Sequence, residues 1–194
     1  MKSLFKIFVL LFVFSLQVVL ANSVSQDAYN KSTVYYEKQD YVNELKWLKK
    51  SFDEEKTKEV AFNLGLAYKN LKDYNNSIKW YKKAFEMGDL GGGLNTAQVY
   101  KSKFNDIPKA IKWYKKAIKK GHIDARKNLG LLYHQQKDSL NSATYMIGMI
   151  GHPYTKERVL GLLRDDWKID EPTLKKAYEL QKTLVPNPYK GGID

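Results

Sequence analysis

Ile78-Lys79-Trp80-Tyr81-Lys82-Lys83 is the stretch that decides the fold, because the chain repeats it twice. It returns almost unchanged at Ile111-Lys112-Trp113-Tyr114-Lys115-Lys116 and in a weaker form at Leu45-Lys46-Trp47-Leu48-Lys49-Lys50, so that the three tryptophans are 33 residues apart. A period of this length is typical of arrays of helix pairs, in which no unit can bury its apolar face without a neighbour. The sequence therefore predicts an all-α chain of stacked helical hairpins.

The start of each tryptophan-bearing helix is marked by an aspartate seven residues upstream, at Asp40, Asp73 and Asp106. A carboxylate at this place can accept hydrogen bonds from the free amides of the first helical turn. Adding the same period once more predicts a fourth such helix with Ser139 as its N-cap. In this register Ala143 takes the place of Ala110, and Met146 takes the place of Trp113.

The partner helices carry a second repeated phrase. Asn63-Leu64-Gly65-Leu66-Ala67-Tyr68 matches Asn128-Leu129-Gly130-Leu131-Leu132-Tyr133, with Asn95 to Tyr100 as a weaker copy and Tyr35 as the mark of a degenerate first one. Together with a glycine after the second helix, at Gly88 and Gly121, this pattern resembles Sel1-like repeats, which are relatives of the tetratricopeptide class. The resemblance covers about residues 30–150 and implies a right-handed α-solenoid of about four repeats. The units are short for Sel1-like repeats, so plain tetratricopeptide repeats are the alternative.

The fourth tryptophan-type helix differs from the others, because the segment 143–150 is apolar where its predecessors have lysines. An apolar outer face must be covered, and the residues that follow it predict two capping helices. The first runs from about Thr155, as its N-cap, to Leu163, and the second from Asp170 to Leu184, with Trp167 as an anchor between them. We therefore expect a repeat array at 22–153, a cap at 154–184 and an extended, loosely held tail at 185–194.

The C-terminal segment carries a second resemblance. From Gly151-His152-Pro153 through Tyr189-Lys190-Gly191-Gly192-Ile193-Asp194 it is similar to the end of Sel1-like immunity proteins associated with type VI secretion lipase effectors. That resemblance implies a protein that binds and neutralises a toxic effector, and it assigns no contact residue. Sel1-like secreted proteins that carry a cysteine pair in each repeat differ from this chain, which has no cysteine.

The N-terminus has the pattern of a secretory signal, because Lys2 and Lys6 flank and precede an apolar run that ends near Ala21. We expect cleavage after Ala21 and a periplasmic or secreted bacterial product without an integral membrane span. The alternative is an uncleaved anchor, since residues 4–21 approach the length that spans a bilayer. The absence of cysteine excludes both a lipoprotein anchor and disulfide bonds.

The formal net charge at pH 7 is +12, and lysines recur in the second helix of each pair. Their i, i+3, i+4 spacing predicts a stripe opposite the tryptophans, formed by Lys79, Lys82, Lys83, Lys112, Lys115 and Lys116. Stacking would align these lysines into a basic ridge that attracts a partner protein with an acidic surface. The alternative is that they only keep the outer face solvated. The candidate binding lysines are Lys79, Lys82, Lys112 and Lys115.

Three asparagines, Asn63, Asn95 and Asn128, recur at one position of the first helices. A column of amide side chains could hydrogen-bond the backbone of an extended peptide, as in tetratricopeptide clamps. The alternative is a structural role, in which each amide bonds to neighbouring backbone. We expect no nucleic-acid partner, because the aromatic residues fall at repeat positions that face the partner helix and no recognition motif is present.

Enzyme signatures are missing from the sequence. The three histidines, His122, His134 and His152, are far apart, and no nucleophile elbow, metal-ligand spacing or phosphate loop occurs. We therefore expect no catalytic residue, metal or cofactor. The sequence favours a non-enzymatic periplasmic protein-interaction module, with an immunity protein against a lipase-type effector as its specific form. An envelope scaffold or adaptor, and a hydrolase acting on cell-envelope material, are the alternatives.

Overall fold

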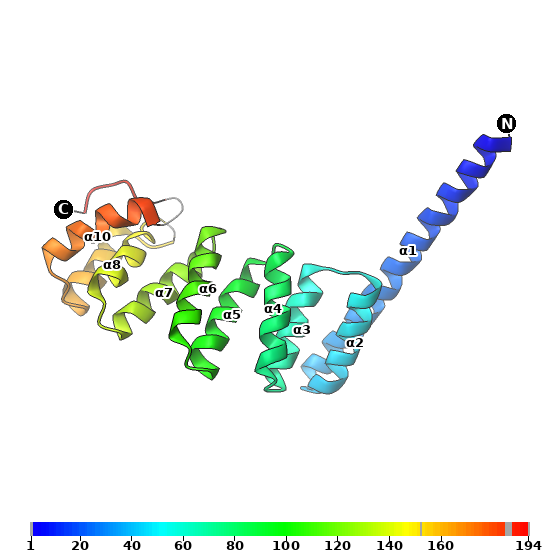
Figure 1. The fold of residues 1–194 in the computed structure, drawn as a ribbon, viewed down its shortest axis with the longest axis horizontal. Coiled ribbons are helices and arrows are strands. Elements are labelled where there is room, and N and C mark those ends of the chain that lie inside the picture. Colours follow the sequence, from blue (N-terminus) through cyan, green and yellow to red (C-terminus); the bar gives the residue numbers. More distant parts are fainter. Residues whose placement is uncertain (1, 152, 185–187, 194) are drawn as a thin grey trace. The chain divides into compact units, whose positions relative to one another are not determined.

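The computed structural model describes residues 2–151, 153–184 and 188–193 (Figure 1). Within these residues the chain forms ten α-helices and one π-helical turn and no strand. The helices are α1 (Lys2–Glu37), α2 (Tyr41–Glu54), α3 (Lys58–Asn70), α4 (Tyr74–Glu86), α5 (Leu90–Lys103), α6 (Ile107–Lys119), α7 (Ile123–Gln135), α8 (Ser139–Ile147), α9 (Lys156–Gly161) and α10 (Glu171–Leu184), and the π-helical turn η1 (Leu162–Asp166) follows α9. The all-α prediction is confirmed.

The chain divides into two compact units, residues 1–92 and 93–194, and α5 begins in the first unit and ends in the second. In the first unit α1 packs on α2, α2 on α3 and α3 on α4. The core of this unit is a buried apolar cluster from α2, α3 and α4, formed by Leu48, Phe52, Val60, Ala61, Leu64, Ala67 and Ala84. On each helix the apolar residues are three or four positions apart and therefore share one face. These faces pack against one another between neighbouring helices, as the hairpin pattern requires.

Gly65 explains how closely α3 and α4 approach. A Cβ atom added there would lie 2.5 Å from the ring of Tyr81, so only glycine leaves room for the tyrosine. The hydroxyl of Ser77 donates to the Gly65 carbonyl at 2.8 Å and joins the two helices at the same level. The repeated Leu-Gly phrase of the sequence is thus a helix-crossing point.

The predicted helix caps are present at Asp40, Asp73 and Asp106. Each carboxylate accepts a hydrogen bond from the amide three residues further on, at 3.0–3.1 Å. The fourth cap was predicted one residue too late, because Asp138 and not Ser139 accepts the Asn141 amide, at 3.0 Å. Glycines close the second helices as expected, since Gly88 and Gly121 have φ of 98° and 94°, a backbone conformation that suits glycine.

The register of the fourth repeat is therefore corrected by one residue. The turn before α6 is one residue longer than the turn before α8, since the amide of Asp106 bonds back six residues to Tyr100 and that of Asp138 bonds back five to Tyr133. Tyr145 thus takes the place of Trp113. Met146 takes the place of Tyr81 instead, and its side chain lies 2.9 Å from a Cβ built on Gly130.

In the second unit α8 lies beneath α10, as the apolar segment 143–150 predicted (Figure 1). Every residue from 142 to 150 is buried. The buried cluster at this place joins side chains of α8 to side chains of α9, η1, α10 and the C-terminal segment. Among its members are Ile147, Leu163, Leu174, Ala177 and Ile193. Trp167 packs against this cluster, and its indole stacks on His134 of α7 with ring centroids 3.9 Å apart.

The cap differs from expectation in two details. The helix that begins after Thr155 ends at Gly161 and continues as η1, in which the Trp167 amide bonds to the Leu162 carbonyl at 2.9 Å. Residues 188–193 are extended, but they are not loosely held. The amide and carbonyl of Tyr189 both bond to the side chain of Gln181, at 3.0 and 2.6 Å.

Ile193 completes the attachment of this segment. Its side chain is 4% exposed within the cap cluster, and its carbonyl accepts from Arg164 at 2.8 Å. The prediction of a loose tail was wrong. Two prolines and two glycines prevent a helix, but they allow an extended backbone that makes contacts along its length. Residues 185–187 and 194 lie outside the described residues.

The first helix is continuous from Lys2 to Glu37. Among its described side chains, Ile7, Leu11, Val13 and Leu20 are exposed, and burial against the repeat begins with Ser25 and Ala28. Within the described part of the chain, no helix combines the length and the apolar character needed to cross a bilayer. Whether residues 1–21 are a cleaved signal or an anchor stays a prediction.

Candidate functional site

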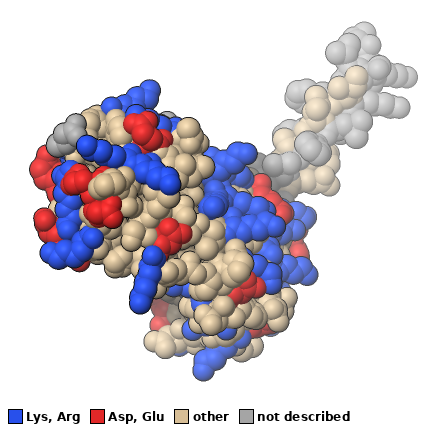
Figure 2. Space-filling model, turned by 60° about the vertical axis from the view of Figure 1, so that its left-hand side comes forward, with Lys and Arg blue, Asp and Glu red and all other residues tan. Residues whose placement is uncertain are grey.

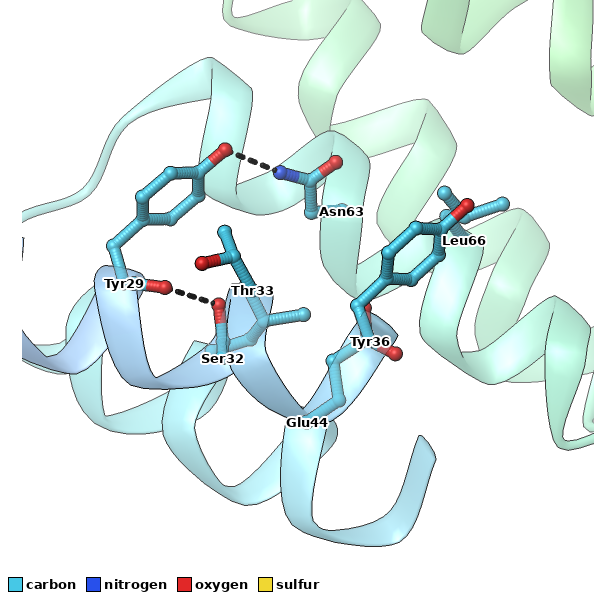
Figure 3. Close-up of a pocket in the computed structure, with 8 residues that line it drawn as sticks. Tyr29, Ser32, Thr33, Tyr36, Glu44, Asn63 and Leu66 are labelled. Atoms are coloured by element: carbon cyan, nitrogen blue, oxygen red, sulfur yellow. Dashed lines mark hydrogen bonds between the residues drawn. The ribbon is translucent and has the colours of Figure 1, made fainter. Parts of the chain in front are cut away.

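A pocket of about 260 Å³ opens in the first unit, between α1, α2 and α3 (Figure 3). We name it the Glu44 pocket; it is lined by Tyr29, Ser32, Thr33, Tyr36, Glu44, Leu48, Asn63 and Leu66. Tyr29 and Tyr36 stand on opposite sides of it, with Asn63 across from Glu44. The lining contains a carboxylate, an amide and four hydroxyl groups and no basic residue.

Helix geometry brings these side chains together. Tyr29, Ser32, Thr33 and Tyr36 are three, four and seven residues apart on α1, so they share one face of that helix. The neighbouring helix α2 contributes Glu44 from its first turn. The first helix of the next repeat, α3, closes the pocket from the other side with Asn63 and Leu66.

Glu44 is the exceptional residue of this pocket. Its side chain is only 3% exposed, and its Oε2 atom is buried without a hydrogen-bond partner. Burial penalises the charged form and raises the pKa of Glu44 from 4.5 to about 7. The carboxyl group is therefore partly protonated at neutral pH, and an incoming hydrogen-bond donor would find a free acceptor.

The repeat itself shows that Glu44 is a departure from the pattern. Glu44 stands four residues after its helix cap, and the same position in α4, α6 and α8 holds Ser77, Ala110 and Ser142. All three are small and buried, and Ser77 bonds to the facing helix. Sequence analysis missed Glu44, although an acidic residue at a small-residue position of an aligned repeat was a usable signal.

Two hydroxyls of the pocket, those of Ser32 and Thr33, already donate their hydrogens to the backbone. The hydroxyls of Ser32 and Thr33 donate to the carbonyls of Tyr29 and Asn30, at 2.6 and 2.7 Å. The amide of Asn63 donates to the hydroxyl oxygen of Tyr29 at 3.0 Å. Because their hydrogens are used within the protein, the Ser32 and Thr33 oxygens keep only lone pairs to offer a ligand.

The three predicted asparagines are placed differently. Asn63 lines the pocket, and its amide donates to a tyrosine hydroxyl of the preceding repeat. Asn95 on α5 and Asn128 on α7 are half-buried in the second unit. The column that would join Asn63, Asn95 and Asn128 stays a prediction.

The predicted lysines lie on α4 and α6. Lys79, Lys112 and Lys115 are exposed, and Lys82 is half-buried. The stripe was wrong for Lys83 and Lys116, which do not lie opposite the tryptophans.

Lys83 Nζ is 5.7 Å from the ring centroid of Trp80, and Lys116 Nζ is 4.4 Å from that of Trp113. A lysine three residues after a tryptophan shares its helix face, so the ammonium groups rest on the indoles.

Basic side chains are spread over the face drawn in Figure 2, with acidic side chains between them. Residues 22–92 hold 12 basic and 11 acidic residues, and residues 93–138 hold 11 basic and 3 acidic ones. The positive charge of the array thus belongs mainly to the second unit. A continuous ridge across α4 and α6 stays a prediction.

A second pocket, of about 310 Å³, lies within the second unit between α7, α8 and the cap. At the edge of this pocket, Lys127 Nζ and Arg158 Cζ lie over the ring of Tyr154, 5.7 and 5.2 Å from the ring centroid. Leu131, Met146, Val159 and Leu162 form its apolar wall, and Asp166 completes the lining. Its character is cationic and apolar, in contrast to the Glu44 pocket.

The histidines form no catalytic array among the described residues. His134 stacks on Trp167, and His122 precedes α7, whereas His152 lies outside the described residues. In the part of the chain that the structure describes, no group of three or more histidine, cysteine or acidic side chains is arranged to hold a metal ion.

Comparison with known proteins agrees with the fold. The tetratricopeptide repeat family matches residues 59–87, which cover α4 and all of α3 except its first residue. Among solved structures, the chain is similar to a tetratricopeptide repeat protein from Parabacteroides merdae ATCC 43184, with a TM-score of 0.59, 18% sequence identity, and coverage of 81% of this chain and 72% of that one. No curated protein matches the sequence. The chain is therefore an all-α protein built of tetratricopeptide-like repeats, with the solenoid fold of that class.

Proposed function

We propose that the protein is a non-enzymatic binding module that holds a segment of a partner protein in the Glu44 pocket. The single observation that supports this most strongly is the buried, unpartnered Oε2 atom of Glu44, in a pocket that the Asn63 amide also lines. A protein rarely retains such a group without a partner, because desolvating it costs free energy. Tetratricopeptide-like repeats point to protein partners, and this pocket is a place where one can bind.

The described residues favour binding over chemistry. Next to Glu44 the pocket offers two hydroxyl groups whose hydrogens are already donated, two tyrosines, an amide and apolar walls, and its lining holds no histidine or basic residue to activate a nucleophile. A carboxyl group alone is a poor catalytic apparatus, whereas fixed polar groups in a half-apolar pocket are well suited to orient a bound segment.

The second unit supplies the charge for the acidic partner surface that we expect. Lys112 and Lys115 are exposed on α6, and Lys127 and Arg158 edge the cationic pocket. Basic side chains that face solvent accelerate encounter with an acidic surface more than they add affinity. We include Lys79 and Lys82 of α4 in this proposal, with Asn95 and Asn128 as further contacts.

The decisive experiment captures the partner from cell-envelope extract and compares two variants. Thr33→Trp fills the Glu44 pocket from an exposed position on α1, and Glu86→Gln changes an exposed residue of α4 that lies outside it. We expect one dominant partner that Thr33→Trp loses and Glu86→Gln retains. Equal capture by both variants would remove the pocket from the proposal, and several unrelated partners would favour an envelope scaffold.

Export belongs to the same proposal. Residues 1–21 act as a cleaved signal, so that the working protein begins at Asn22 in the periplasm or outside the cell. Mass spectrometry of the protein from periplasmic extract tests this directly. A mass that lacks residues 1–21 supports export, and an intact chain in the membrane fraction would instead identify an anchor.

The specific form to test first is an immunity protein that neutralises a lipase-type effector. The support for it is the sequence resemblance of the segment 151–194, whose described residues contribute to a cap with Ile193 in its core. Deletion of the gene should make cells sensitive to a toxin encoded beside it, and the purified protein should suppress that toxin's lipase activity. Full lipase activity in the presence of excess protein would refute this form and leave the binding module intact.

A further inference from the structure

We infer that the Glu44 pocket is a receptor for the ammonium group of a lysine side chain, presented by the segment of the partner protein that the pocket holds. The inference rests on the proposed function, because it names the chemistry that this site would recognise. Its first support is the hydrogen-bond inventory of the pocket.

The inventory is rich in acceptors, and its remaining donors are the Tyr29 and Tyr36 hydroxyls. Glu44 offers Oε2, and Ser32 and Thr33 offer oxygens whose hydrogens already bond to backbone carbonyls. The Asn63 amide is directed to the Tyr29 hydroxyl. A ligand that brings donors therefore satisfies the Glu44 carboxylate and both hydroxyl oxygens, and an alkylammonium group brings three. A carboxylate or phosphate group brings none and would lie against a buried acid.

Burial of Glu44 strengthens this preference. With 3% exposure and no cation in the pocket lining, its carboxylate has lost water without gaining an ion-pair partner. A cation placed against Oε2 supplies the missing partner, so binding recovers what folding lost at this atom. Neutral ligands with an amide donor gain only a part of this stabilisation.

The aromatic walls and the volume also fit a lysine. Tyr29 and Tyr36 are seven residues apart on one face of α1 and flank the pocket in Figure 3. Ring faces at such a site attract an ammonium group, and the rings also cover its methylene stem. The volume of about 260 Å³ lies below the roughly 300–1,000 Å³ of sites for drug-sized molecules, so one side chain fills it.

Overall charge does not oppose a cation here. The first unit is close to neutral from Asn22 onward, with 12 basic and 11 acidic residues, whereas the positive excess lies between residues 93 and 138. The first unit would therefore bind the lysine of the partner, and the second unit would attract the acidic surface of the partner.

The test is a titration of the purified full chain, labelled at its tyrosine rings for NMR. The ligands are acetyl-Ala-Ala-Lys-Ala-Ala-amide, the same peptide with acetylated lysine, and n-butylammonium chloride. The variants are Glu44→Gln, which keeps the size of the side chain and removes its charge, and the control Glu54→Gln, an exposed glutamate of the same helix.

We expect the lysine peptide to shift the Tyr29 and Tyr36 ring signals in the wild type and in Glu54→Gln. Glu44→Gln should weaken this binding about tenfold to a hundredfold, the range for loss of a hydrogen bond to a charged group. Acetylation should weaken it as strongly, because it removes the charge and two donors. The n-butylammonium ion should bind more weakly than the peptide, since it lacks the backbone.

Three outcomes would overturn the inference. These are equal affinity for the acetylated peptide, unchanged affinity in Glu44→Gln, and absence of tyrosine shifts at millimolar lysine peptide. Equal affinity for n-butylammonium and the peptide would overturn the assignment to a protein lysine and leave a small amine as the ligand. Failure here is distinguishable from failure of the proposed function, because partner capture that depends on Thr33 can persist without any affinity for lysine.

Discussion

Replacing Glu44 by glutamine should stabilise the protein at alkaline pH and leave its stability almost unchanged in acid. The pKa of Glu44 is raised from 4.5 to about 7 by burial, so the folded protein binds more protons than the unfolded chain between these values. Stability contributed by the protonated carboxyl is therefore present below pH 4.5 and is lost as the pH rises through 7. A shift of this size corresponds to about 3 kcal/mol at most.

The assay is urea unfolding of wild type, Glu44→Gln and Glu54→Gln at pH 4.5 and pH 8.5, followed by circular dichroism. The difference in unfolding free energy between Glu44→Gln and wild type should grow by up to about 3 kcal/mol from the lower to the higher pH. The other ionisable groups that line the pocket, Tyr29 and Tyr36, are common to both proteins and cancel in the difference. A difference that stays constant between the two pH values, or one that Glu54→Gln reproduces, would refute the reasoning.

The remaining predictions concern the repeat packing, the cap and the charge. Gly65→Ala should cost about 1–3 kcal/mol, because its Cβ would meet the Tyr81 ring at 2.5 Å, whereas Gly130→Ala should cost less, because the flexible Met146 can move; thermal unfolding of both variants compares them. Leu174→Ala should cost about 2–5 kcal/mol by urea unfolding, since the side chain is fully buried between α10 and α8, and a loss below 1 kcal/mol would contradict the covering role of α10. Ile193→Ala should destabilise the cap and raise hydrogen exchange at Tyr189, and unchanged exchange would mean that the last residues are held by hydrogen bonds alone. Lys112→Gln with Lys115→Gln should slow association with the captured partner most at low salt, and rates that match wild type across a salt series would show that these lysines only solvate α6.

Local chemistry explains what could be predicted from the sequence. Asp40, Asp73 and Asp106 satisfy the first amides of their helices, and their spacing repeats because every hairpin must stack in the same way. The covered face of α8 could also be predicted from the sequence. Apolar residues at positions where other repeats have lysines require a covering element. Such features depend on near neighbours in the chain.

Features that depend on tertiary contacts could not be predicted from the sequence in this way. The fourth repeat begins one residue earlier than the period of 33 predicts. The turn before α6 holds an extra residue, so the spacing of the helix caps stays at 33 up to Asp106 and is one residue shorter from Asp106 to Asp138. The C-terminal segment is ordered by Gln181 and Arg164, whose roles no local pattern shows. Glu44 was overlooked because its importance lies in the absence of a partner, which only the packing of α1, α2 and α3 reveals.

Site-specific photocross-linking tests the central claim, that the Glu44 pocket is where a partner protein binds. A benzophenone amino acid replaces Thr33, an exposed residue of the pocket lining, or Glu86, an exposed residue of α4, in cells that express the natural partner. The account predicts a cross-linked partner from position 33 and none from position 86. Cross-linking from position 86 without any from position 33 would contradict it.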